Sequence, residues 1–200
     1  MSAHPHPIPH LTIGTLGHQG HGKTTLARAL SVPRSAGGGP PGPVPGYPVA
    51  APVPSGLPRR FRCATDTRRY TVLDPARATD RLDGAVLAVS VLEGVRPGTV
   101  EHIALARRSG LAPLVVALTM ADEGADALTE RVEAEVRTLL TAHGYNGETL
   151  PAVRVSAGRA LAGEPRWRGT IDALLDAVDT YVPLPAECER GHPGPRSHAG

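Results

Sequence analysis

One short stretch near the start of the chain constrains the fold more than any other. Residues 17–24 read Gly-His-Gln-Gly-His-Gly-Lys-Thr, which matches the pattern G-x-x-x-x-G-K-S/T of a phosphate-binding loop. Residues 10–16 before it are typical of a short strand, and residues 24–30 after it indicate a helix with Leu26 and Leu30 four apart. A chance match in a glycine-rich chain is the alternative, but the flanking elements favour a site for the phosphates of a nucleotide.

The residue types in this loop suit a bound phosphate chain. Glycines let the backbone turn its N–H groups toward phosphate oxygens, beside a helix N-terminus that favours negative charge. Lys23 would reach the terminal phosphates, and the Thr24 hydroxyl would be a ligand for Mg²⁺. The nucleotide-binding residues predicted from this segment are Gly17, His18, Gln19, Gly20, His21, Gly22, Lys23, Thr24 and Thr25.

Length and composition fit one domain with tails and exclude several classes. The 200 residues carry a net charge of +2, with no clustered basic stripe that would argue for nucleic acid. No apolar stretch reaches the roughly 18 residues of a membrane span, and the N-terminus lacks the features of a signal peptide. Cys63 and Cys188 have no metal-binding spacing, which favours a reducing compartment. We therefore expect a soluble, cytoplasmic chain without membrane contact.

The composition changes abruptly after the first helix. Between residues 37 and 58, fourteen of 22 residues are Gly or Pro. Such a segment buries too little apolar surface to offset its ordering entropy. We expect a disordered or polyproline-like insertion at about 33–59, and a proline-rich docking peptide is the sharper alternative.

Regular elements resume at residue 60 and alternate between strands and helices. Strands are predicted at 60–66, 68–74, 84–91, 114–118 and 152–156, the first two as an antiparallel pair, and helices at 99–109, 126–143 and 170–181. This order predicts an α/β fold, mostly a parallel sheet with helices on both faces. Ligands of such sheets lie beyond the carboxyl ends of the strands, so residues 17–24, Asp74, 119–122 and 156–158 are the candidates for chemistry.

Several of these segments carry longer sequence patterns. They are Pro9–Thr25 (PHLTIGTLGHQGHGKTT), Asp83–Val89 (DGAVLAV), Glu101–Arg107 (EHIALAR), Val132–Leu140 (VEAEVRTLL) and Asp179–Pro185 (DTYVPLP). In order and spacing they resemble the GTP-binding domain of bacterial elongation factor Tu. The resemblance covers about residues 10–32 and 60–186, and it is specific to translational GTPases.

This resemblance implies a P-loop NTPase G domain at residues 10–184, between a flexible tail at 1–9 and a disordered tail at 185–200. The implied cofactors are GTP or GDP with Mg²⁺. Thr24 and Asp74 would hold the metal, and Asp122, Ser156 and Ala157 would join the phosphate loop in binding the nucleotide.

The chain also departs from the family at several motifs. The D-C-P-G-H motif, whose glycine senses the γ-phosphate and whose histidine positions water, reads Asp74-Pro-Ala-Arg77 here. The N-K-x-D motif reads Thr119-Met-Ala-Asp122, and S-A-L reads Ser156-Ala-Gly158. The threonine of switch I is replaced by the Gly/Pro-rich tract. Diphosphate binding should survive, guanine affinity should fall about tenfold or more, and hydrolysis lacks its usual residues.

The switch II region is shortened as well. Nine residues separate Asp74 from Gly84, where the family has nearly twenty and a helix. Nine extended residues span about 30 Å, whereas nine helical ones span roughly 14 Å. We therefore expect a stretched crossover without a helix. The sheet face left partly bare would carry an exposed apolar patch that invites a protein partner or self-association.

Three functions remain open at this point. The first is a GTP-binding, translational-type G domain with weak or absent hydrolysis, and with no direct tRNA binding because the family's barrel domains are not in the sequence. The second is a slow GTPase completed by a partner such as the ribosome, with His18 or His21 as alternative catalytic groups. The third is a structural remnant or interaction module that no longer uses nucleotide.

Overall fold

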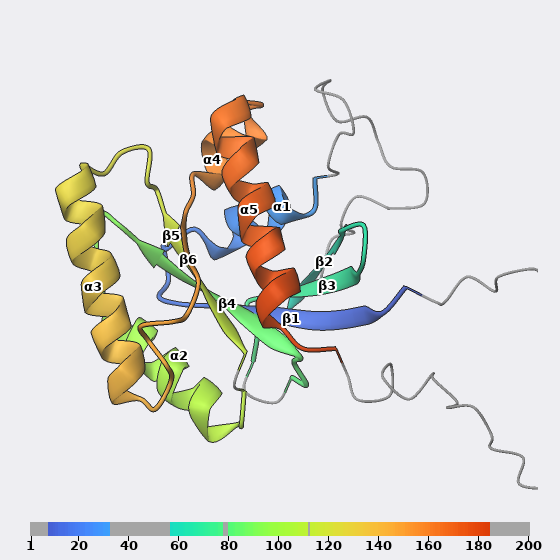
Figure 1. The fold of residues 1–200 in the computed structure, drawn as a ribbon, viewed down its shortest axis with the longest axis horizontal. Helices are drawn as coiled ribbons and strands as arrows, with labels where there is room; N and C mark the ends of the chain where they lie inside the picture. The colour runs from blue at the N-terminus through green and yellow to red at the C-terminus, as the bar shows by residue number, and fades with distance from the viewer. Residues whose placement is uncertain (1–7, 33–56, 78–79, 112, 185–200) are drawn as a thin grey trace, which may run out of the picture.

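The computed structural model describes residues 8–32, 57–77, 80–111 and 113–184. Within these residues a six-stranded sheet has the order β2-β3-β1-β4-β5-β6 (Figure 1). The strands are β1 (His10–Leu16), β2 (Arg59–Ala64), β3 (Arg69–Asp74), β4 (Gly84–Ser90), β5 (Leu114–Thr119) and β6 (Ala152–Arg154). The helices are α1 (Lys23–Leu30), α2 (Pro97–Arg108), α3 (Asp126–Ala142), α4 (Ala157–Leu161) and α5 (Pro165–Tyr181). Each strand pair is parallel except β2 with β3, so the predicted fold class is confirmed.

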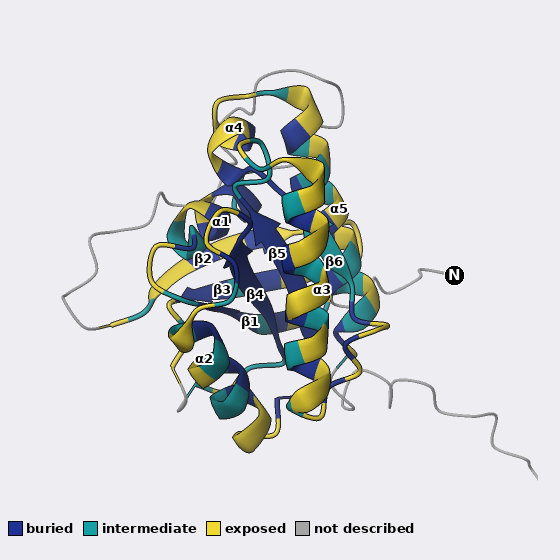
Figure 2. Ribbon diagram, turned by 90° about the vertical axis from the view of Figure 1, so that its left-hand side faces the viewer, coloured by how far each residue is buried: buried dark blue, intermediate teal, exposed yellow. Residues whose placement is uncertain are grey.

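The sheet is covered by helices on both faces. Helices α1 and α5 pack on one face, where Leu26 and Leu174 are fully buried, and α2 and α3 pack on the other, with Ile103 and Val136 buried (Figure 1). In Figure 2 the central strands are buried, while α3 turns an exposed face outward. All seven residues of β4 are buried, because an apolar run suits a strand covered on both faces.

The start of α5 and the presence of α4 differ from the prediction. The helix begins at Pro165, five residues before the predicted start, because proline suits the first helical position. Trp167 lies one turn before Ile171 and packs into the same core. Helix α4 was not predicted at all, and its N-cap Ser156 accepts a hydrogen bond from the backbone N–H of Arg159.

The connection between β3 and β4 follows the expected course. The described residues 75–77 and 80–83 form no helix. Ala76 and Leu82 pack on Gly14 of β1, where a Cβ atom would come within 2.5 Å of the Ala76 Cβ. A glycine at this position lets the short connection lie directly on the sheet.

The sheet face near this connection is partly bare, and charged side chains lie at its edge. Alternate residues of β2 are exposed, and they include Arg60 and Arg62, with Arg69 exposed on the neighbouring β3. The exposed large hydrophobic residues of the described chain are Ile8, Leu57, Leu92 and Leu161, all from other segments. Charged side chains therefore occupy the uncovered positions of β2 and β3, and a protein partner at this face stays a prediction.

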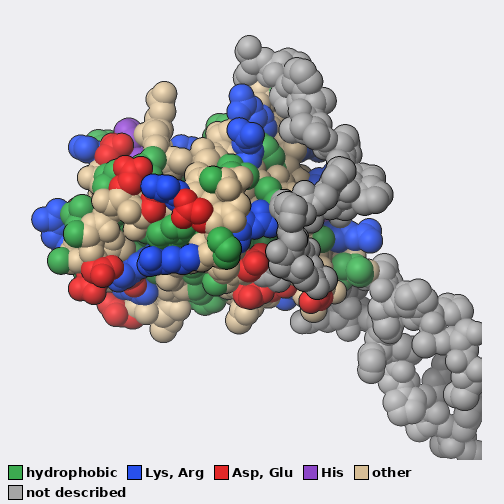
Figure 3. All heavy atoms as spheres, turned by 90° about the horizontal axis from the view of Figure 1, so that it is seen from above, with side chains coloured by type: hydrophobic (Ala, Val, Ile, Leu, Met, Phe, Trp, Pro, Cys, Tyr) green, Lys and Arg blue, Asp and Glu red, His purple; other side chains and the backbone are tan. Residues whose placement is uncertain are grey.

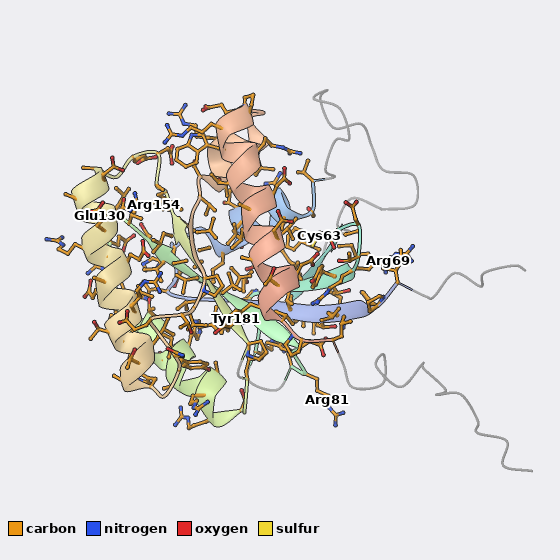
Figure 4. The ribbon with its side chains drawn as sticks, in the orientation of Figure 1. Cys63, Arg69, Arg81, Glu130, Arg154 and Tyr181 are labelled. Atoms are coloured by element: carbon orange, nitrogen blue, oxygen red, sulfur yellow. The ribbon has the colours of Figure 1, made fainter. Side chains whose placement is uncertain are left out.

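The described surface mixes charges of both signs. Acidic and basic side chains lie next to one another on the face shown in Figure 3. Figure 4 shows Arg154 of β6 beside Glu130 of α3, and the Arg154 Nη2 atom lies 3.9 Å from Glu130 Oε1. Arg81 points away from the body of the domain (Figure 4). Among the described helices, none has the length and apolar character needed to cross a membrane.

Candidate functional site

The phosphate loop joins β1 to α1 and depends on glycines with positive φ. Gly17 has φ +126°, and a Cβ atom there would lie 2.2 Å from the carbonyl oxygen of Ala88 on the neighbouring β4. Gly22 has φ +76° and is the N-cap of α1. The loop therefore lies against the central strands in a conformation that other residues would strain.

Lys23 is positioned across the loop. Its Nζ atom donates to the carbonyl oxygens of Gly17 at 2.9 Å and His18 at 2.6 Å. Burial lowers the pKa of Lys23, while the charge of Asp74 opposes that shift. A phosphate group entering the loop would offer the ammonium group a charged acceptor in place of neutral carbonyls.

Asp74 connects β3 with the phosphate loop. This carboxylate is 1% exposed, and it accepts the hydroxyl of Thr24 at 2.6 Å on Oδ2 and the hydroxyl of Thr15 at 2.6 Å on Oδ1. The Thr24 hydroxyl donates a hydrogen bond to Asp74, so the lone pairs of the Thr24 oxygen remain available to a hard cation. Oxygen ligands beside a buried negative charge fit Mg²⁺, which keeps several waters and binds through few protein groups and the substrate phosphates.

Two histidines of the loop lie close together, but they differ in surroundings. His21 is fully buried, and neither ring nitrogen makes a hydrogen bond of normal geometry within the described residues. Its Nε2 atom lies 3.9 Å from Glu93 Oε2, and its ring centroid is 5.3 Å from that of His18. Burial lowers the pKa of His21, and Glu93 partly opposes this effect. Both histidines are thus packed parts of the loop.

His102 of α2 also contacts the loop, although sequence reasoning did not single it out as a site residue. Its Nδ1 atom accepts the backbone N–H of Gly17 at 2.9 Å. Burial lowers the pKa of His102, which favours the neutral ring that this acceptor role requires. The signal in the sequence was its place in the Glu101–Arg107 segment, but nothing in that segment indicates a partner 85 residues away.

A second part of the site is a cavity of about 290 Å³ at the ends of β5 and β6. Its lining residues are Gly22, Thr25, Thr119, Met120, Asp122, Glu123, Ser156, Ala157, Gly158 and Arg159. The pocket therefore brings the three predicted base-binding residues Asp122, Ser156 and Ala157 next to the phosphate loop. We call this cavity the base pocket, after the residues predicted to bind the base.

Asp122 is held in this pocket by the side chains of Arg159 and Ser156. The Nε atom of Arg159 donates to Asp122 Oδ2 at 3.1 Å, and Arg159 Nη1 also donates to Glu164 Oε1 at 3.1 Å. Burial raises the pKa of Asp122, but hydrogen bonds from Ser156 and Arg159 outweigh it and lower the pKa overall. The carboxylate is thus ionised and oriented, as an acceptor for N–H donors must be.

The 119–122 segment keeps only the aspartate of the family's motif, but it retains a link to the phosphate loop. The hydroxyl of Thr119 donates to the carbonyl oxygen of His21 at 3.0 Å. Met120 lies in the pocket lining with φ +58°. A short hydroxyl side chain therefore ties the base-binding segment to the phosphate loop.

A larger hollow of about 410 Å³ lies between α2 and the β3–β4 connection. Leu16, Leu82 and His102 are among the residues that line it. The backbone N–H of Ala76 is bonded to the carbonyl oxygen of Thr15 at 3.2 Å, and that of Arg77 to Asp80 Oδ2 at 2.7 Å. These two N–H groups are thus engaged within the protein at the position where the family's γ-phosphate sensor stands.

The structure brings the predicted site residues together where the ends of β1, β3, β5 and β6 lie near the start of α1. Gly17, His18, His21, Gly22, Lys23 and Thr24 shape the phosphate loop, while Gln19 and Gly20 are exposed at its tip and Thr25 lines the base pocket. The sequence did not indicate Arg159, Glu93 or His102 as contacts of this site, and it indicated Thr119 only as part of the strand end at 119–122. A parallel sheet, a glycine loop at the end of β1 and an acceptor-lined pocket two strands away define the GTPase-type class of P-loop nucleotide-binding domain.

The family within that class follows from comparison with known proteins. The model for the elongation factor Tu GTP-binding domain matches residues 72–184, so the chain belongs to this family and the resemblance seen in the sequence is confirmed. Elongation factor Tu 2 of Streptomyces avermitilis is 47% identical over 194 residues, which cover 88% of this chain and 49% of the relative. The chain spans about half the length of this curated relative.

Proposed function

We propose that this chain binds GDP and GTP with Mg²⁺ and hydrolyses GTP poorly or not at all. The observation that carries the proposal is the network in which Asp74 accepts both Thr15 and Thr24 beside Lys23. Burying a carboxylate costs free energy unless it is paired, and this carboxylate lies beside the phosphate loop with two neutral hydroxyl donors. A bound cation would supply the pairing. Diphosphate and metal binding therefore rest on an assembled set of groups.

Weak hydrolysis is inferred from the β3–β4 connection. Hydrolysis requires a positioned water and a group that responds to the γ-phosphate. The N–H groups of Ala76 and Arg77 are bonded to Thr15 and Asp80, so they do not face the loop as free donors. His21 is buried behind the loop, which argues against a role as the water-positioning group.

A slow GTPase completed by a partner is the second candidate function. It is favoured by family membership, because the matched relative is named as an elongation factor. A ribosome or another partner would then supply the missing group, and the location would be the cytoplasm. The third reading, a remnant without nucleotide, is disfavoured by the Thr24–Asp74 and Arg159–Asp122 contacts.

The proposal is tested by calorimetric titration of the full chain with GDP, GTP and ATP in Mg²⁺, with Lys23→Ala as the control. Binding that prefers guanine and disappears in the variant supports it. A phosphate-release assay on the same sample then separates a binding module from a slow GTPase. Absence of binding by the wild-type chain would refute both nucleotide functions.

A further inference from the structure

The base pocket holds a donor and an acceptor side by side, from two different elements. Asp122 lies in the loop after β5, and Arg159 lies on α4, 37 residues later in the chain. The Asp122 side chain is 13% exposed, whereas that of Arg159 is 57% exposed. A carboxylate largely shielded from water thus lies next to a guanidinium group that remains accessible from the pocket.

Asp122 has acceptor capacity beyond these contacts. An ionised carboxylate offers about four lone-pair sites. Arg159 donates one N–H to Oδ2, and Ser156 donates its hydroxyl, so acceptor sites remain for donors of a base. Arg159 is also held at its Nη1 atom by Glu164, which fixes the guanidinium plane from the far side. Arg159 therefore need not leave for a base to reach Asp122.

The order of these groups matches one purine edge better than the other. Guanine presents its N1–H and N2 amino donors next to the O6 acceptor, whereas adenine places the acceptor N1 next to its N6 amino donor. Donors paired with Asp122 would bring O6 toward the adjacent Arg159 side chain. An adenine in the same place would put an amino group against the guanidinium donors, leaving both without acceptors.

We propose that Arg159 is a specificity-determining residue that recognises the O6 side of guanine, next to Asp122. The inference rests on the proposed nucleotide binding and deepens it. It supplies a reason for guanine preference in a chain whose 119–122 segment lacks the family's Asn and Lys. Arginine is suited to this role because it remains charged and presents its donors in a fixed fork.

The test compares GDP, IDP and ADP binding to the full chain and to Arg159→Ala. Inosine retains O6 and N1–H but lacks the N2 amino group, so it separates recognition of O6 from recognition of N2. We expect GDP and IDP affinity to fall equally, by roughly tenfold or more, while ADP affinity stays unchanged. Glu164→Gln should also lower the ratio of GDP affinity to ADP affinity, but by less than Arg159→Ala does. Arg131→Ala, at an exposed arginine of α3 that does not line the pocket, should change none of the three affinities.

Each other outcome counts against the proposal. An unchanged GDP-to-ADP ratio in Arg159→Ala and Glu164→Gln would overturn it, and so would a rise in GDP affinity, which would show that Arg159 blocks the pocket. Equal losses of affinity for GDP, IDP and ADP would show only that the charge of Arg159 attracts the diphosphate. If wild-type GDP binding depends on Lys23 but the ratio does not depend on Arg159, this inference alone fails. If the wild-type chain binds no diphosphate, the proposed function fails with it.

Discussion

The hydroxyl of Thr24 donates to Asp74 Oδ2 at 2.6 Å, and this bond joins the start of α1 to the end of β3. The two residues are 50 positions apart, with the Gly/Pro-rich tract between them. The half of the site that we propose to hold Mg²⁺ is therefore assembled by the pairing of β1 with β3, whatever the length of the intervening segment.

The first prediction concerns Asp74→Asn. The substitution removes the charge beside Thr24, so the enhancement of GDP binding by Mg²⁺ should be lost. It should also lower the free energy of unfolding by about 2 kcal/mol, because the asparagine side chain has one acceptor oxygen, which is neutral, for the two hydroxyl donors. Calorimetry with and without Mg²⁺, together with urea unfolding, measures both effects.

Thr15→Val is the matched control for that variant. It removes the bond to Asp74 Oδ1 but leaves Thr24 and the charge in place. We expect a loss of about 1–2 kcal/mol in stability and a retained response to Mg²⁺. A normal Mg²⁺ response in Asp74→Asn would contradict the assignment of the metal site.

The second prediction compares two glycines of the phosphate loop. At Gly17 a Cβ atom would lie 2.2 Å from the carbonyl oxygen of Ala88, whereas at Gly20 the nearest atom is Glu93 Oε1 at 3.9 Å. Both have positive φ, so Gly20→Ala should cost about 1 kcal/mol, the strain of the backbone alone. Gly17→Ala should cost at least about 3 kcal/mol, because β4 must move as well. Urea unfolding of both variants checks the difference, and equal losses would show that the contact with Ala88 is not limiting.

The third prediction is a gain of affinity from Gly158→Leu. A Cβ atom at this pocket-lining position meets nothing within 4 Å, so a side chain has room. Covering roughly 40 Å² of apolar surface at about 25 cal/mol per Å² gives about 1 kcal/mol, or about fivefold tighter GDP binding. Gly169→Leu on α5, which is equally open but lies outside the pocket lining, should leave the affinity unchanged. Weaker GDP binding in Gly158→Leu would place the base elsewhere.

The fourth prediction is a loss of stability in mild acid. Burial lowers the pKa values of His21 and His102 below the ordinary value of 6.5. Below about pH 6.5 the unfolded chain binds protons at these positions that the folded chain does not, so the free energy of unfolding falls as the pH falls toward the folded-state pKa values. Urea unfolding at pH 7.5 and pH 5.5 measures the slope.

His21→Gln should flatten that slope in part, since His102 still contributes. A slope that is identical in wild type and His21→Gln would mean that His21 is protonated to the same extent in the folded and unfolded chains.

The sheet and its helices could be predicted from the sequence because their signals are local. Apolar runs such as residues 84–90 and the helical spacing of Val132, Val136 and Leu140 are visible within a few turns. Helix α4 escaped prediction because five residues are too short to show a period. The early start of α5 had a signal in Pro165, two residues before a buried tryptophan, which the spacing of the apolar residues alone does not reveal.

The candidate site likewise has one part that could be predicted from the sequence and one part that could not. The phosphate loop was predictable because its ligands are backbone groups and adjacent side chains. Contacts such as Thr119 with His21, 98 residues apart, and Gly17 with His102, 85 residues apart, depend on how neighbouring strands are aligned. Sequence patterns identify strand ends but do not show which side chains meet across them, so neither Arg159 nor the partner of Thr119 was predicted.

The bond from Thr119 to His21 has one further consequence. It holds the base pocket and the phosphate loop together in the structure without a ligand. If the chain binds nucleotide as proposed, the two parts of the site are already spaced for a nucleoside diphosphate. A base fragment and pyrophosphate should then occupy their halves independently and weakly. Joining them through a ribose of the right span would multiply the two affinities, because the protein need not reorganise to receive the whole molecule.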